Sequence, residues 1–305
     1  MHRRQFLGAA AAAACSTSAL ANSLAPRAPL ASSNSSSAAS GAPDSSPFPL
    51  SIMLWTIYRD QPFDQRLEKV AEAGYHAAEL VGEFKDWKPE DFARVRKKRE
   101  SLGITFDATS GVKSGLVDPA QREATLKEVT AILDVMAELQ CDKLILLSGN
   151  KVEGLSHQQM HANCVDSIKF AADLAAKKNV ELLIENIDPE ENPKYFLTSV
   201  NEGFDIIREV ARPNVKFLYD FFHEQISEGN LIEKLEKNID VVGLVHIADV
   251  PGRHEPGTGE INYGNIFRKL RDLNYHHYAA MEFIPTHDPV QSLKAAREMV
   301  ASVFA

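Results

Sequence analysis

Four residues with metal-binding side chains follow short apolar runs in the second half of the chain. They are Glu185, Asp220, His246 and Glu282, and apolar residues precede each of them. A charge in such a setting is costly unless a partner compensates it, and three converging carboxylates repel one another unless a proton or a cation intervenes. We therefore predict that the four residues bind one divalent metal ion. Carboxylate and imidazole ligands suit Mn²⁺, Mg²⁺ or Co²⁺, and Zn²⁺ is also compatible.

Each of these residues also has an ordinary structural interpretation when it is taken alone. A single acidic residue at a strand end is more often a helix cap or a salt-bridge partner, and a single histidine is more often a hydrogen-bonded core residue. One such residue at the end of each of four consecutive strand-like runs favours the metal site.

A regular alternation of short apolar runs and longer helical segments must position these residues. The helical segments have apolar residues at spacings of three and four, as Val129, Leu133 and Met136 illustrate. Eight such repeats predict a single-domain α/β fold, a (β/α)8 TIM barrel, over residues 48–305. The strand-like runs are residues 50–56, 77–81, 104–108, 143–148, 180–185, 215–220, 241–248 and 278–283.

An open doubly wound sheet is the main alternative to the barrel. Such sheets usually have a glycine-rich phosphate loop after the first strand, and the segment 55–58, Trp-Thr-Ile-Tyr, has no glycine. The active sites of TIM barrels lie at the carboxyl ends of the strands. The four candidate ligands occupy such ends on consecutive runs, so the barrel would bring them together.

The chain resembles the xylose-isomerase-like TIM-barrel superfamily, and within it the hydroxypyruvate isomerase and ketose 3-epimerase branches. The resemblance extends from about Leu50 to Phe304, and its most specific part is the segment 246–263, HIADVPGRHEPGTGEINY. It implies that the four strand-end residues hold one metal ion. His246 stands where many hydroxypyruvate isomerases have Gln, which favours the epimerase-like relatives and leaves the exact substrate open.

The resemblance also implies three substrate-binding residues. His223 completes an Asp-x-x-His motif that begins at Asp220, and this His usually contacts the substrate in the family. Glu191, six residues after the first ligand, corresponds to a substrate-contacting Glu of the epimerases. Arg253 corresponds to an Arg that follows the third ligand by about six residues. An Arg at this position would be a good partner for a substrate carboxylate.

Several further residues have more than one interpretation. Trp55 and Tyr58 are candidates for an apolar wall over the substrate, and core packing is an equal interpretation for Trp55. Glu79 is a candidate for a hydrogen bond across the barrel mouth. For Glu255, in the loop that contains Arg253, an exposed position is at least as consistent with the sequence as a role in the site.

The expected chemistry is proton transfer between neighbouring carbons of a small sugar or hydroxy-keto acid. Glu185 and Glu282 would remove and return the proton, and the metal would stabilise the enediolate between these steps. Return to the neighbouring carbon is isomerisation, as in hydroxypyruvate isomerase, and return to the opposite face of the same carbon is ketose 3-epimerisation. A metal-dependent lyase or hydrolase that acts on 3-keto sugars remains an alternative.

Two other function classes are disfavoured. Apurinic-site endonucleases need a basic face, whereas the formal net charge here is -9, which also argues against any nucleic-acid partner. A non-catalytic sugar-binding barrel would be expected to lack one of the two catalytic Glu residues, whereas this chain has both, Glu185 and Glu282. Homo-oligomerisation stays open.

The first 47 residues resemble an export signal followed by a linker and are not expected to belong to the catalytic domain. Arg3 and Arg4 precede Phe-Leu and an alanine-rich run, which is similar to a twin-arginine (Tat) signal over residues 1–21 and implies a periplasmic or extracellular enzyme. The apolar run is too short for a membrane span. A lipid anchor at Cys15 is a weaker alternative to cleavage. Residues 22–47 are rich in Ser, Ala and Pro, which predicts a disordered linker.

Overall fold

The computed structural model describes residues 46–303, which form one parallel eight-stranded sheet surrounded by helices. The predicted signal segment and all but the last two residues of the predicted linker lie outside this range. The strand order β1-β8-β7-β6-β5-β4-β3-β2 follows the chain around a ring. The strands are β1 Leu50–Ile52, β2 Ala77–Val81, β3 Thr105–Ser110, β4 Lys143–Leu147, β5 Glu181–Glu185, β6 Val215–Asp220, β7 Val242–Ile247 and β8 Ala279–Met281.

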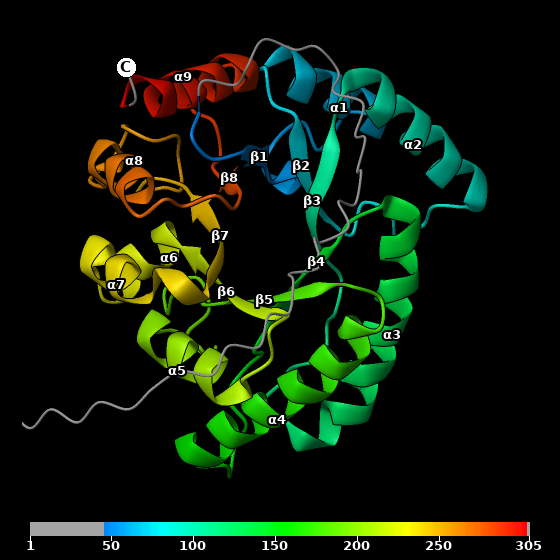
Figure 1. The fold of residues 1–305 in the computed structure, drawn as a ribbon, viewed down its shortest axis with the longest axis vertical. Coiled ribbons are helices and arrows are strands. Elements are labelled where there is room, and N and C mark those ends of the chain that lie inside the picture. The colour runs from blue at the N-terminus through cyan, green and yellow to red at the C-terminus, as the bar shows by residue number, and fades with distance from the viewer. Residues whose placement is uncertain (1–45, 304–305) are drawn as a thin grey trace, which may run out of the picture. The chain divides into compact units, whose positions relative to one another are not determined.

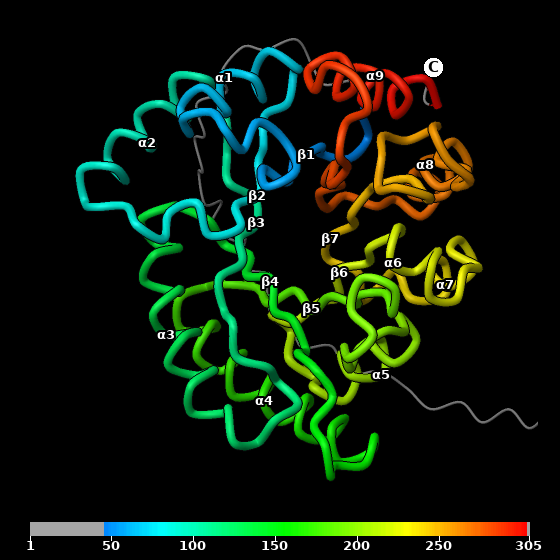
Figure 2. The backbone as a smooth tube through the Cα atoms, turned by 180° about the vertical axis from the view of Figure 1, so that it is seen from behind, coloured from blue at the N-terminus to red at the C-terminus, as the bar shows by residue number. Residues whose placement is uncertain are grey.

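The ring of strands closes between its first and last members. A parallel bridge joins Met53, just after β1, to Glu79 on β2, and the Met53 amide donates to the carbonyl of Met281 on β8, at 3.0 Å. Figures 1 and 2 show the helices outside the ring from opposite sides. These are α1 Phe63–Glu72, α2 Pro89–Leu102, α3 Arg122–Leu139, α4 His157–Ala176, α5 Val200–Val210, α6 Phe221–Ser227, α7 Leu231–Asn238, α8 Tyr263–Asp272 and α9 Pro289–Ser302. The fold is the predicted TIM barrel.

Alternating side chains of the strands fill two separate apolar layers. Leu182 and Ile184 of β5 face the helices and belong to the large outer core, whereas Leu183 belongs to a small cluster inside the barrel. Because successive strand residues point to opposite faces, every second position of a strand lies inside the barrel. The interior cluster consists of Met53, Ala108, Ile145, Leu183, Leu218, Leu244 and Ala280.

Two elements differ from the sequence-based expectation. The strand expected over residues 50–56 ends at Ile52, and a short 3-10 helix, Leu54–Thr56, follows it. A helix that the apolar pattern did not predict, α6, begins directly after β6 because the Asp220 side chain caps it. Among the described residues, no helix is both long enough and apolar enough to cross a membrane.

Helix α5 approaches strand β6 so closely that one helical position has no room for a side chain. A Cβ atom at Gly203 would lie 2.2 Å from Cε2 of the buried Phe217 ring. Backbone freedom is not the reason for this glycine, because a helix interior disfavours it. The absence of a side chain at Gly203 allows α5 to pack closely on the sheet.

We therefore expect Gly203→Ala to lower the free energy of unfolding by about 1–3 kcal/mol, the usual cost of overpacking a core. The matched control is Gly264→Ala in α8, where a Cβ would meet nothing nearer than 3.6 Å. That variant should be neutral or gain up to about 1 kcal/mol from its better helix propensity. Urea denaturation of both variants measures the difference, and equal stabilities would contradict the packing argument.

Candidate active site and metal centre

The barrel places all four predicted ligands in one layer at its carboxyl mouth. Each follows a residue of the interior cluster by two positions, so each points inward like that residue. Asp220 and His246 are also direct neighbours in the register of β6 and β7. The pairs of interior residue and ligand are Leu183 and Glu185, Leu218 and Asp220, Leu244 and His246, and Ala280 and Glu282.

The four side chains form one compact buried cluster. One ligand atom from each residue lies within 4.8 Å of the corresponding atoms of the others. The Nδ1 atom of His246 is 2.8 Å from Glu282 Oε2, 3.3 Å from Glu185 Oε1 and 3.8 Å from Asp220 Oδ2. None of the four residues is more than 7% exposed. Three carboxylates thus share a small volume that is nearly closed to water.

A carboxylate on the far side of the His246 ring orients the ring toward the cluster. Glu79 of β2 is fully buried, and its Oε2 lies 3.0 Å from His246 Nε2. This is the hydrogen bond across the barrel mouth for which the sequence made Glu79 a candidate. A proton on Nε2 would be donated to Glu79 and would leave the Nδ1 lone pair directed at the three carboxylates. Metal-binding histidines commonly have such an outer carboxylate partner.

Asp220 combines the structural and the site role that the sequence left as alternatives. Its Oδ1 caps helix α6 by accepting from the amides of Phe222 and His223, at 2.7 and 3.2 Å. Its Oδ2 lies in the cluster and is also 3.5 Å from His223 Nε2. The other ring nitrogen of His223 is 2.6 Å from Asp188 Oδ2. Burial lowers the pKa of His223, but Asp220 and Asp188 outweigh it and raise this pKa to about 9.

Arg253 extends over the cluster from the loop after β7. Its guanidinium lies 2.8 Å from Glu282 Oε2 and 2.7 Å from Glu191 Oε2. Its carbon Cζ also lies 5.4 Å from the Trp55 ring centre and 4.9 Å from that of Phe222. All three predicted substrate-binding residues, His223, Glu191 and Arg253, are therefore next to the predicted ligands.

The two predicted catalytic carboxyl groups have opposite electrostatic environments. Burial raises the pKa of Glu185 above its usual range, and the nearby His246 offsets this only in part. Burial also opposes charge on Glu282, but Arg253 and His246 outweigh it and hold the Glu282 pKa well below its usual range. Trp55 Nε1 donates to Glu282 Oε1, at 2.8 Å, and favours the same ionised form. Protonation is therefore more favourable at Glu185 than at Glu282.

The donor atoms of the cluster suit a divalent cation. Within the described part of the chain, His246 Nδ1 is buried without a well-directed hydrogen bond, although Glu282 Oε2 and Glu185 Oε1 lie 2.8 and 3.3 Å from it. Buried polar atoms normally have partners, so this nitrogen indicates a missing one. Burial would lower the pKa of His246, yet Glu282 and Glu79 hold it well above its usual range. The centre therefore favours a positive charge, which a metal ion supplies.

A cavity of about 240 Å³ opens beside the cluster. Glu185, Glu282, His223, Glu191 and Arg253 all line it, so the predicted catalytic and substrate-binding groups face one space. Its apolar lining includes Trp55 and Leu147, so Trp55 lies where the sequence suggested an apolar wall. Tyr58, the other candidate for that wall, is not among the lining residues and instead packs against the outer core.

One buried residue that the sequence did not single out, Asp249, organises the loop that contains Arg253. It is fully buried, and its two carboxylate oxygens accept from the amides of Val250, Gly257, Gly259 and Ile261, each at 2.9–3.0 Å. A second buried carboxylate, Glu255, accepts from Thr286 and Ser292 and joins the loop to the start of α9. Glu255 is thus an anchor and not an exposed residue. The only sequence signal for Asp249 is its place at the end of β7.

We expect Asp249→Ala to loosen this loop, because four amides, of which that of Ile261 is buried, would lose their acceptor. An unsatisfied buried donor costs about 1–3 kcal/mol, so the free energy of unfolding should fall by at least that amount. Amide hydrogen exchange over residues 250–261 should also accelerate. The control Asp240→Ala removes an exposed carboxylate that pairs with Arg208 and should change stability by less than about 1 kcal/mol. Wild-type exchange in the loop of Asp249→Ala would contradict this role.

Comparison with known proteins places the chain among sugar isomerases. Hydroxypyruvate isomerase of Escherichia coli (strain K12) is 30% identical over 241 residues, which cover 77% of this chain and 93% of the relative. The 2-oxo-tetronate isomerase of Haemophilus influenzae is 28% identical over 245 residues, which cover 79% and 95%.

Solved structures share the barrel. AP endonuclease, family 2 from Brucella melitensis, has a TM-score of 0.72 at 26% identity and covers 81% of this chain and 97% of its own. A D-psicose 3-epimerase has a TM-score of 0.72 at 22% identity, with coverage of 84% and 98%, and shows the shared fold alone. The family model described as a xylose isomerase-like TIM barrel matches residues 67–303. The chain therefore belongs to the xylose isomerase-like TIM-barrel family, and its relatives identify it as an enzyme of the sugar isomerase and epimerase type.

Proposed function

We propose that this protein is a metal-dependent isomerase of a small hydroxy-carbonyl substrate, with a reaction like that of hydroxypyruvate isomerase. The observation that carries the proposal is the buried cluster of Glu185, Asp220, His246 and Glu282 beside the 240 Å³ cavity. Relatives named hydroxypyruvate isomerase and 2-oxo-tetronate isomerase support the reaction class.

In this proposal the four clustered residues hold one divalent ion, Mn²⁺, Mg²⁺, Co²⁺ or Zn²⁺. When bound, the ion would supply Lewis-acid polarisation of the substrate carbonyl. Glu79 would keep the His246 ring in orientation through its 3.0 Å contact. The capping contacts of Asp220 would hold that carboxylate at the strand end.

Glu185 and Glu282 are the proposed catalytic residues, and their environments assign them unequal roles. Glu185 has the raised pKa and would take the proton from the carbon beside the carbonyl. If Glu185 returns the proton to the neighbouring carbon, and the proton of the substrate hydroxyl moves to the former carbonyl oxygen, the product is the isomer. Glu282 stays ionised beside Arg253, and its lowered pKa makes protonation of this carboxylate less favourable than protonation of Glu185.

The pairing of Arg253 favours a second candidate function, ketose 3-epimerisation. Arg253 already contacts the carboxylates of Glu191 and Glu282, so it is less available to bind the carboxylate of an acid such as hydroxypyruvate. A neutral ketose needs only hydrogen bonds donated by His223 and Arg253 and accepted by Glu191. Delivery of the proton to the opposite face of the same carbon would then require Glu282.

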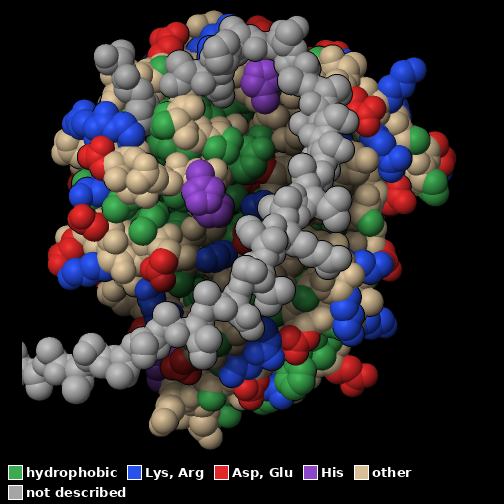
Figure 3. All heavy atoms as spheres, viewed as in Figure 1, with side chains coloured by type: hydrophobic (Ala, Val, Ile, Leu, Met, Phe, Trp, Pro, Cys, Tyr) green, Lys and Arg blue, Asp and Glu red, His purple; other side chains and the backbone are tan. Residues whose placement is uncertain are grey.

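Nucleic acid is not a substrate in this proposal. The formal net charge of the chain is -9, and Figure 3 shows acidic and basic side chains intermingled around the face that it presents. A phosphate backbone binds a concentrated positive field.

The proposal predicts that Glu185→Gln slows proton transfer by about 10²–10⁴-fold, the usual contribution of a general acid–base group. The measurement is NMR of deuterium incorporation in D₂O from hydroxypyruvate, D-fructose and related ketoses, together with elemental analysis of bound metal. The matched control is Glu181→Gln at the opposite end of the same strand, which should exchange at the wild-type rate. The labelled product distinguishes isomerisation from epimerisation.

Two outcomes would contradict the proposal. One is a purified wild-type protein that binds none of the four metal ions when each is supplied. The other is deuterium exchange that proceeds equally in wild type and Glu185→Gln. Addition and removal of the metal should also shift the midpoint of thermal unfolding, because a ligand bound only by the folded state stabilises that state.

We also propose that the enzyme is exported through its twin-arginine segment, residues 1–21. Cell fractionation tests this with the double variant Arg3→Lys and Arg4→Lys, which should keep the full-length protein in the cytoplasm. Arg27→Lys, beyond the proposed signal, is the control and should leave export unchanged. Equal export of the double variant would overturn the proposal.

A further inference from the structure

A second, larger pocket adjoins the catalytic cavity. It has a volume of about 680 Å³, and the loops after β3, β4 and β5 line it, on the same side of the barrel as the clustered carboxylates. Leu147 lines both spaces. This side chain ends β4, is the register partner of Glu185 and is 39% exposed. The Leu147 side chain therefore belongs to the walls of both the catalytic cavity and the larger pocket.

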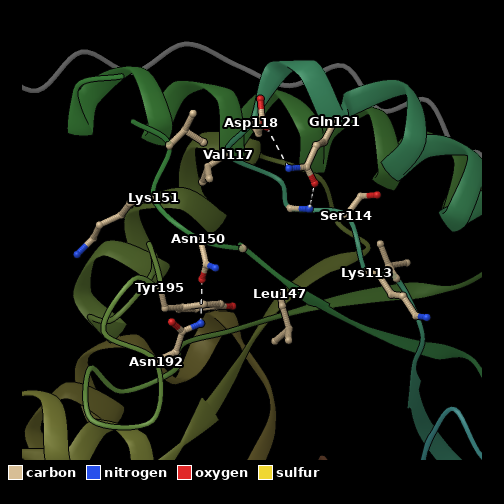
Figure 4. Close-up of a pocket in the computed structure, with 14 residues that line it drawn as sticks. Lys113, Ser114, Val117, Asp118, Gln121, Leu147, Asn150, Lys151, Asn192 and Tyr195 are labelled. Carbon is tan, nitrogen blue, oxygen red and sulfur yellow. Dashed lines mark hydrogen bonds between the residues drawn. The ribbon is translucent and has the colours of Figure 1, made fainter. Parts of the chain in front are cut away.

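The walls of the larger pocket are held in place by hydrogen bonds (Figure 4). Asn192 Nδ2 donates to Asn150 Oδ1 at 2.8 Å and joins two of the loops. Gln121 accepts from the Gly115 amide at 2.9 Å and donates to Asp118 at 3.0 Å. The backbones of two loops also touch, since a Cβ at Gly149 would lie 2.6 Å from the Gly115 Cα. Such cross-links indicate a preformed site.

The lining of the larger pocket suits a neutral polyol better than an anion. Its polar groups include the side-chain amides of Asn150 and Asn192, and its apolar groups include Leu147. Amides can pair with neighbouring hydroxyls, while apolar side chains can cover the C–H faces of a sugar ring. Two lysines, Lys113 and Lys151, also line the pocket, but Figure 4 shows them on opposite sides of it, so they do not converge on one anion.

The sizes of the two spaces indicate how a substrate would be divided between them. Pockets for organic ligands usually measure roughly 300–1,000 Å³. The catalytic cavity, at about 240 Å³, lies below this range, and the adjoining pocket, at about 680 Å³, lies within it. A ligand larger than one small sugar would exceed the catalytic cavity, and the pocket past Leu147 has room for the rest of it. Leu147 and Val81 both line the catalytic cavity and are exposed apolar side chains.

We propose that the larger pocket is a subsite for a second sugar unit, so that the preferred substrate is a glycoside whose reacting sugar lies beside Glu185. The reaction of that sugar rests on the function proposed above, but binding of the second unit does not. Asn150 and Asn192 hydrogen-bond the second sugar, and Leu147 contacts both units at their junction.

The probes are the ketose disaccharides isomaltulose and lactulose, with 3-ketosucrose, compared with D-fructose. Calorimetry should show that at least one disaccharide binds the full-length protein about tenfold more tightly than D-fructose, and Glu185→Gln should retain this preference. Asn150→Trp, which fills the pocket, should lower the ratio of disaccharide to fructose affinity about tenfold. Lys177→Trp, at the far end of α4, should leave the ratio unchanged. Asn192→Ala provides a second, smaller change if Asn150→Trp does not fold.

The outcomes separate this inference from the proposed function. If no disaccharide binds more tightly than fructose, or if both pocket variants keep the wild-type ratio, the subsite does not exist, even when fructose exchanges deuterium. Tighter binding of fructose 6-phosphate than of any disaccharide would assign the pocket to an anion and also overturn the inference. Disaccharide binding that both pocket variants weaken supports the subsite, even when no substrate exchanges deuterium and the proposed function fails.

Discussion

The carboxylates of Glu185, Asp220 and Glu282 converge in the buried mouth of the barrel, and their repulsion is the constraint on which the site depends. The positive charges of Arg253 and of protonated His246 offset part of this repulsion. The raised pKa of His246 reflects the same demand, because a proton on its ring is stabilised where a cation is needed. A metal ion at the centre would satisfy the three carboxylates together and leave His246 neutral.

The predicted metal ligands come from strand ends, whereas several residues around the cavity come from loops. The four clustered residues stand at or directly after the ends of neighbouring strands, where the backbone is hydrogen-bonded on both sides and positions are fixed by the alternation of side chains. The groups around the substrate space, such as Arg253 and Asn150, come from loops. Asp249 accepts from amides of the loop of Arg253, and Asn192 donates to Asn150 in the other loop. Because the strand ends and these loops are hydrogen-bonded, the side chains of the site are already positioned before a ligand binds.

Outer partners orient three of the four candidate ligands. Glu79 holds one face of His246, the amides of α6 hold one oxygen of Asp220, and Trp55 holds one oxygen of Glu282. Each contact engages one polar atom of the side chain and leaves the other in the cluster. The same asymmetry separates the pKa values of Glu185 and Glu282, because Arg253 approaches only the second of them. Two identical side chains thereby become suited to different tasks.

The sequence by itself determined the barrel and the four clustered residues, because both depend on local regularities. An apolar run repeated eight times with helical segments between requires a parallel sheet, and a polar residue at each carboxyl end must then face the same mouth. Only the tertiary structure decided the partners of those residues. Glu79 and His246 are 167 positions apart, and Trp55 and Glu282 are 227 apart, so no spacing rule connects them. Helix α6 and the pocket beyond Leu147 were likewise invisible in the pattern, since a side-chain cap and the packing of three loops arise only when distant segments meet.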